Sequence, residues 1–72
     1  MEKFSEYLKR MSNENLVWLS KETEVLYFSE ISPINDLLKK YFPSKIGIIE
    51  MRSVVLFEIT ERINDNELTL NN

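Results

Sequence analysis

The sequence predicts an all-α domain, a small bundle of three to four helices whose C-terminal helix is long and apolar. Three observations support this fold class. The 72 residues include one glycine and two prolines, so the chain has few of the turn formers that a β-rich fold requires. Apolar residues recur at intervals of three and four along most of the chain, which is the helical period. The most apolar stretch, residues 46–63, predicts the longest helix.

The first two helices are predicted at Glu2–Met11 and Asn13–Glu30. In the first, Phe4 and Leu8 lie one turn apart and share a face. Ser12 stands between the two helices, where its side chain suits the N-cap of the second. The apolar stripe of the second helix consists of Leu16, Leu19, Thr23, Leu26 and Tyr27.

The third helix is predicted to begin with Ser32 as its N-cap and Pro33 at its first helical position, where a missing N–H costs no hydrogen bond. Lys39 and Lys40 occupy its last turn, where positive charge complements the helix dipole, and Pro43 ends it. Its core-facing residues are Ile34, Leu37, Leu38, Tyr41 and Phe42.

The fourth helix is predicted over Ser44–Ile63, with Ser44 as its cap. One stripe at helical spacing consists of Ile48, Met51, Val55, Ile59 and Ile63, with Ile49 and Leu56 at its edge. Val54 and Phe57 point the other way, so the helix carries apolar residues on more than one face.

Arg52 falls inside the apolar stripe of this last helix. A buried guanidinium without an acidic partner costs several kcal/mol, so Arg52 needs either contact with water or an acidic partner. We expect Arg52 to lie at the edge of the core and to extend its charged end into water along its aliphatic stem. An ion pair with Asp36 or Glu30 is the alternative.

An α+β fold with a short hairpin is the alternative fold. Its strands would be Leu16–Ser20 and Val25–Glu30, joined by Lys21–Glu24. This joining segment has no glycine, asparagine or aspartate at its centre, and the apolar pattern fits a period of 3.6 better than a period of 2. The helical interpretation is therefore favoured.

The chain is predicted to form one helical domain over residues 1–63, followed by a polar, flexible tail over residues 64–72. No signal peptide is recognisable, and no uncharged apolar run reaches the ~18 residues that span a bilayer. The absence of cysteine fits a reducing compartment. We therefore expect a cytoplasmic protein that does not enter a membrane.

Composition argues against an enzyme or a metalloprotein. The chain has no cysteine and no histidine, which removes thiolate ligands and the commonest general base. The paired carboxylates Glu22 with Glu24 and Glu58 with Glu61 are predicted on solvent-facing sides, where Glu58 can pair with Arg62 four residues on. No catalytic residue, metal ligand or cofactor site is predicted.

Nucleic acid is not the expected partner, because the net charge is −3 and phosphate binding requires a basic surface. The nearest basic group is Lys39, Lys40 and Lys45. These lysines flank a predicted helix end, where they complement its dipole.

One local resemblance points to DNA all the same. Leu19–Val25 followed by Tyr27–Ile31 resembles parts of a phage-repressor-type helix-turn-helix, and Pro33–Leu38 resembles the start of that family's next helix. The resemblance implies a DNA-binding transcriptional regulator, and this is the alternative function. The chain departs from the pattern: Glu24 stands where the turn glycine is expected, the turn is too short, and Leu26–Ile31 is apolar and acidic. No family residue is carried over.

Protein binding is the function that the sequence favours. A 72-residue domain buries only about 60% of its unfolded surface, and this one has no disulfide to stabilise it. Two predicted helices nevertheless carry a second apolar patch, which is typical of an interface. The predicted partner-binding residues are Trp18, Val25, Phe28, Val54 and Phe57, with Arg52 as a polar specificity element. We expect a non-enzymatic regulator of the inhibitor, adaptor or antirepressor type that also forms a homodimer through its last helix.

Overall fold

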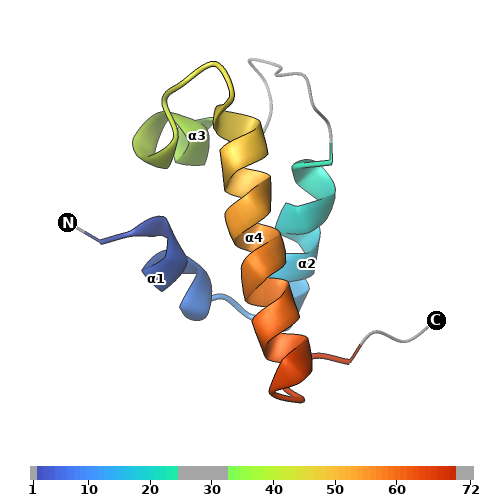
Figure 1. Cartoon of the computed structure of the whole chain (residues 1–72). Coiled ribbons are helices and arrows are strands. Elements are labelled where there is room, and N and C mark those ends of the chain that lie inside the picture. The colour runs from blue at the N-terminus through green and yellow to red at the C-terminus, as the bar shows by residue number, and fades with distance from the viewer. Residues whose placement is uncertain (1, 25–32, 70–72) are drawn as a thin grey trace.

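The computed structural model describes residues 2–24 and 33–69, and over these residues the chain is all-α, as predicted. Its helices are α1 (Phe4–Lys9), α2 (Asn13–Glu22), α3 (Asn35–Tyr41) and α4 (Gly47–Asn64). Figure 1 shows α4 running through the middle of the molecule, with α1 and α3 on one side and α2 on the other. The three shorter helices all contact α4. The hairpin alternative is wrong, because residues 16–20, its first strand, lie within α2.

α1 and α2 begin close to their predicted positions, although α1 is shorter at both ends. The side chains of Phe4 and Leu8 are buried in the core. Between the helices, the hydroxyl of Ser12 accepts a hydrogen bond from the backbone N–H of Asn15 at 3.2 Å. Ser12 is therefore the N-cap, as predicted, and satisfies one of the N–H groups that the first helical turn leaves without a partner.

α2 ends at Glu22, so the prediction of one helix over Asn13–Glu30 is wrong. The hydroxyl of Thr23 donates to the backbone carbonyls of Leu19 at 3.1 Å and Ser20 at 3.0 Å, and this bonding closes the last turn. Threonine side chains offer the backbone such local partners, which an apolar repeat does not reveal. Most of the predicted continuation of this helix lies outside the described residues.

α3 begins at Asn35, later than predicted. The N-cap position belongs to Ile34, whose φ of −94° and ψ of 2° are not helical. Pro33 therefore precedes the helix in a turn, and its predicted place at the first helical position is wrong. The fixed φ of proline suits either place, so the sequence does not separate them. Ser32, the predicted cap, lies outside the described residues.

The end of α3 and the start of α4 lie close together. Phe42 is the C-cap of α3 and Pro43 follows it, as predicted. Ser44 is not the cap of α4: that position belongs to Ile46, and the carbonyl of Ser44 accepts from the N–H of Gly47 at 3.1 Å in a turn. A side chain at Gly47 would collide with the backbone carbonyl of Phe42, so this close approach requires glycine.

The core lies on the side of α4 that faces the other helices. The predicted stripe of α4 is buried at Ile48, Met51 and Val55, but Ile59 and Ile63 are only half-buried. The ring centroid of Phe4 lies 5.2 Å from those of Tyr41 and Phe42, which joins α1 to the end of α3. The buried cluster consists of Phe4, Leu8, Leu16, Leu19, Ile34, Leu38, Ile48, Met51 and Val55.

The chain turns back after α4. Asn66 has a φ of 60°, the left-handed conformation that asparagine tolerates. The N–H of Glu67 donates to the carbonyl of Arg62 at 2.8 Å and that of Asn66 to the carbonyl of Ile63 at 3.1 Å, which together make a Schellman motif. The motif directs Leu68 onto the protein, where it is 6% exposed. Residues 64–69 of the predicted tail thus include one buried side chain, and the flexibility predicted for 64–72 stays a prediction.

Candidate partner-binding surface and buried polar network

The outward face of α4 carries the exposed apolar residues. Its members, on the side opposite Met51 and Val55, are Ile46, Ile49, Ser53, Leu56, Phe57 and Thr60. The exposed fractions of the large apolar members are 58% for Ile46, 53% for Ile49, 40% for Leu56 and 65% for Phe57. Among the described residues, Trp18 on α2 is the one further large apolar side chain that is exposed. Apolar exposure is therefore concentrated on one side of one helix.

The sequence identified only part of this face. Phe57 is exposed, as its predicted orientation requires, whereas Val54 is half-buried and packs against the core. Ile49 and Leu56 were expected at the edge of the buried stripe, and they are instead exposed. The missed signal is a second repeat at helical spacing, from Ile46 through Ile49 to Leu56.

The predicted contact residues of α2 and the segment after it are only partly described. Trp18 is 43% exposed and lies off the buried stripe of α2, as its spacing indicates. Val25 and Phe28 lie outside the described residues. So does most of the stretch that resembles a helix-turn-helix, apart from the end of α2 and the beginning of α3.

Arg52 joins α4 to α2. Its side chain is half-buried, and one guanidinium N–H donates to the backbone carbonyl of Ser20 at 2.8 Å. Ser20 belongs to the last turn of α2, whose carbonyls lack partners within the helix and carry its partial negative charge. This backbone partner was not predicted, and the predicted ion pair with Asp36 is not formed. Glu30, the other predicted partner, lies outside the described residues. The contribution of Arg52 to partner binding stays a prediction.

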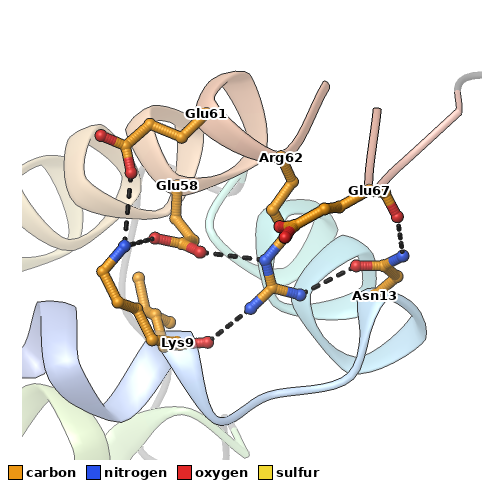
Figure 2. A network of polar contacts seen from close by, with 7 residues as sticks. Lys9, Asn13, Glu58, Glu61, Arg62 and Glu67 are labelled. Atoms are coloured by element: carbon orange, nitrogen blue, oxygen red, sulfur yellow. Dashed lines mark hydrogen bonds and ion pairs between the residues drawn. The ribbon is translucent and has the colours of Figure 1, made fainter. Parts of the chain in front are cut away.

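A buried polar network fastens the C-terminal half of α4 (Figure 2). At its centre Arg62, 6% exposed, donates from Nε to Glu58 at 2.9 Å. Its other nitrogens donate to the side-chain oxygen of Asn13 at 2.9 Å and the carbonyl of Leu8 at 2.7 Å. A buried guanidinium is stable only when its donors are satisfied in this way.

Lys9 completes the network on its exposed side. Its ammonium contacts Glu58 at 3.2 Å and Glu61 at 3.3 Å, so it bridges two carboxylates. Asn13 meanwhile donates to the carbonyl of Glu67 at 2.7 Å, which holds the chain after α4 against the start of α2. The network therefore connects four parts of the sequence: α1, α2, α4 and the segment that follows α4.

The charges of the network shift two pKa values. Burial raises the pKa of Glu58, but the hydrogen bonds from Arg62 and Lys9 outweigh it, so the pKa lies below its ordinary value. The hydrogen bond to Glu58, followed by that to Glu61, raises the pKa of Lys9. Both shifts favour the charged forms of Lys9 and Glu58, which are paired with each other, an arrangement that stabilises structure.

Glu58 corrects one prediction and confirms another. It is 7% exposed, so its predicted place on a solvent-facing side is wrong, whereas its predicted pairing with Arg62 is confirmed. One of its two partners, Lys9, lies 49 positions earlier in the chain, and local periodicity does not show this contact. Within residues 2–24 and 33–69, no group of three or more acidic side chains is arranged to hold a metal ion.

Comparisons with known proteins find no match: no family model and no curated protein matches the sequence, and no solved structure matches the fold. No helix in the described part of the chain combines the length and the apolar character needed to cross a membrane. The geometry of the site therefore carries the functional argument.

Proposed function

We propose that this chain is a small, non-enzymatic regulatory protein of the inhibitor, adaptor or antirepressor type, which acts by binding protein, and that its outward α4 face binds a second copy of itself. The observation that carries the proposal is the exposure of Ile46, Ile49, Leu56 and Phe57 on one helix face. Exposed apolar clusters of this kind mark interaction surfaces.

The distribution of residues on this face suits a twofold interface. Ser53 lies at its centre and is small, so two helices can approach closely there. In an antiparallel pair related by a twofold axis at Ser53, Ile49 meets Phe57 of the other copy, and Ile46 meets Thr60. Ile49, Phe57 and Ile46 thus meet apolar or uncharged side chains, and the six residues of the face include no charge. In the same register Leu56 is level with Glu50 of the other copy, which does not belong to the face.

Sedimentation equilibrium tests this proposal directly. We expect the mass of the wild-type chain to approach that of a dimer as its concentration rises, and the double variant Ile49→Ser/Phe57→Ser to stay monomeric. Trp18→Ser is the matched control, since it removes an exposed apolar side chain from α2, and it should keep the dimer. A wild-type mass that stays that of a monomer up to about 1 mM would overturn the proposal.

The alternative of a helix-turn-helix-like DNA-binding regulator gains no support from a described contact. A titration of labelled duplex at low salt separates the two functions, because phosphate attraction is strongest there. Binding to duplex that survives in Ile49→Ser/Phe57→Ser, together with a monomeric wild type, would favour the alternative.

A further inference from the structure

A cavity lies where α3 ends and α4 begins, at the end of α4 opposite the buried polar network. Its volume is about 420 Å³, within the range of about 300–1,000 Å³ that is typical of small-molecule sites. Apolar lining is supplied by Leu38, Phe42, Pro43 and Ile48. The cavity is partly open to solvent, so a ligand in it would remain in contact with water.

Two lysines give this cavity a positive rim. Lys39 and Lys45 both line it and are exposed, and no acidic side chain is among the described lining residues. Neither ammonium has a polar partner among the described residues, in contrast to Lys9, which contacts two carboxylates. The chain as a whole has a charge of −3, whereas the described lining of this cavity carries two positive charges and no negative one.

The start of α4 contributes to the same electrostatics. Gly47, the first residue of this 18-residue helix, also lines the cavity, and no side chain caps this end of the helix. The partial positive charge of a helix N-terminus therefore adds to that of the lysines. The nearby Glu50 lies outside the lining, and its carboxylate accepts a hydrogen bond from the hydroxyl of Ser44 at 2.8 Å.

From the apolar lining and the positive rim together, we propose that this cavity binds a small amphipathic anion: an aliphatic carboxylate whose chain enters the cavity and whose head group contacts Lys39 and Lys45. Burial of the aliphatic chain against the apolar lining is favourable, and the ammonium groups form charge-assisted hydrogen bonds with the carboxylate. This site is separate from the outward face of α4, and its test does not depend on dimer formation.

Three probes of equal chain length separate the contribution of the aliphatic chain from that of the charged head group. They are octanoate, octanol and octylammonium. Each is titrated into the ¹⁵N-labelled protein, and the backbone amide signals of Leu38, Phe42 and Ile48 are followed by NMR. We expect saturable shifts with octanoate, at least about fivefold weaker binding of octanol, and no saturable shift with octylammonium. Equal binding of octanoate and octanol, or no saturable shift at these amides, would overturn the proposal.

Variants at exposed positions test the lysines without disturbing the core. The double variant Lys39→Gln/Lys45→Gln should weaken octanoate binding about five- to tenfold and leave octanol binding unchanged. Lys3→Gln/Lys21→Gln changes the net charge equally at exposed positions outside the cavity, and it should bind octanoate like the wild type. If the two double variants lose affinity equally, the rim does not recognise the anion and the assignment is wrong.

Discussion

In the C-terminal half of α4, charged residues are buried on one side of the helix and apolar residues are exposed on the other, whereas the opposite is usual. The side that faces the other helices buries Glu58 and Arg62, whereas the outward side exposes Leu56 and Phe57. Each buried charge has partners that satisfy it, so the polar side is part of the folded structure. The exposed apolar side chains contribute little to the fold of a single chain. The contrast teaches that residue type alone does not separate the structural side of this helix from the proposed binding side.

The largest expected effect follows from removing the centre of the network. Arg62→Met leaves Glu58 buried without its closest cationic partner and removes the hydrogen bonds to Asn13 and to the carbonyl of Leu8, so we expect a loss of about 3–5 kcal/mol in the free energy of unfolding. Urea unfolding followed by circular dichroism measures it. Arg10→Met is the matched control, because the ion pair of Arg10 with Glu2 is exposed and should contribute less than about 1 kcal/mol.

A double variant sharpens the same comparison. Replacing both residues, as in Glu58→Met/Arg62→Met, removes the buried carboxylate that Arg62→Met leaves with Lys9 as its remaining partner, so this chain should be more stable than Arg62→Met alone. If the double variant is instead the less stable of the two, the buried pair does not act as a unit.

A smaller effect is expected on lowering the pH. Because the pKa of Glu58 is lower in the folded than in the unfolded chain, its contribution to stability is present above its ordinary value of 4.5 and is lost as the pH falls through the folded pKa. The pKa of Lys9 is raised in the folded chain, so its contribution to stability is present below its ordinary value of 10.5 and is lost as the pH rises through the folded pKa. Unfolding of the wild type and of Glu58→Gln between about pH 5 and pH 3 should show the steeper loss in the wild type. If stability falls equally with pH in the wild type and in Glu58→Gln, the ionisation of Glu58 does not contribute to stability.

Arg52 tests whether a contact between α4 and α2 matters as much as the network. Arg52→Met removes one of the two donors to the carbonyl of Ser20 at the end of α2 but keeps most of the apolar stem, so we expect a loss of about 1–2 kcal/mol. Thermal unfolding detects this change. No change in the unfolding midpoint would show that water replaces the guanidinium at no cost.

The smallest effect on the fold belongs to the outward side. Phe57→Ser should change the free energy of unfolding of the monomer by less than about 0.5 kcal/mol, because the ring is largely exposed. Measurement at low protein concentration, where any dimer dissociates, isolates this value. A loss that approaches that of Arg62→Met would erase the difference between the two sides.

Much of the fold could be predicted from the sequence because its causes are local. The spacing of Leu16 and Leu19 on α2 and of Met51 and Val55 on α4 indicated the buried stripes, and Ser12 was a recognisable cap. The end of α2 could not be predicted in this way, since the apolar repeat continues past Glu22 while the hydrogen bonds of the following residue close the helix.

The candidate surfaces depend on packing between distant segments, so less of them could be predicted. Phe57 was recognisable as an outward residue, but the exposure of Ile49 depends on which side of α4 the other helices cover. Glu58 and Arg52 are held by residues of α1 and α2, tens of positions away. The rim of the cavity is formed locally, since Lys39 on α3 and Lys45 in the turn before α4 are six positions apart.

The concentration dependence of thermal unfolding tests the binding role of the outward side most directly. If a second copy covers this side of α4, the unfolding midpoint of the wild-type chain rises with protein concentration, because dimer formation stabilises the folded state by mass action. The midpoint of Ile49→Ser/Phe57→Ser should stay constant over the same range. A wild-type midpoint that does not change across a hundredfold range of about 10 µM to 1 mM would contradict the account.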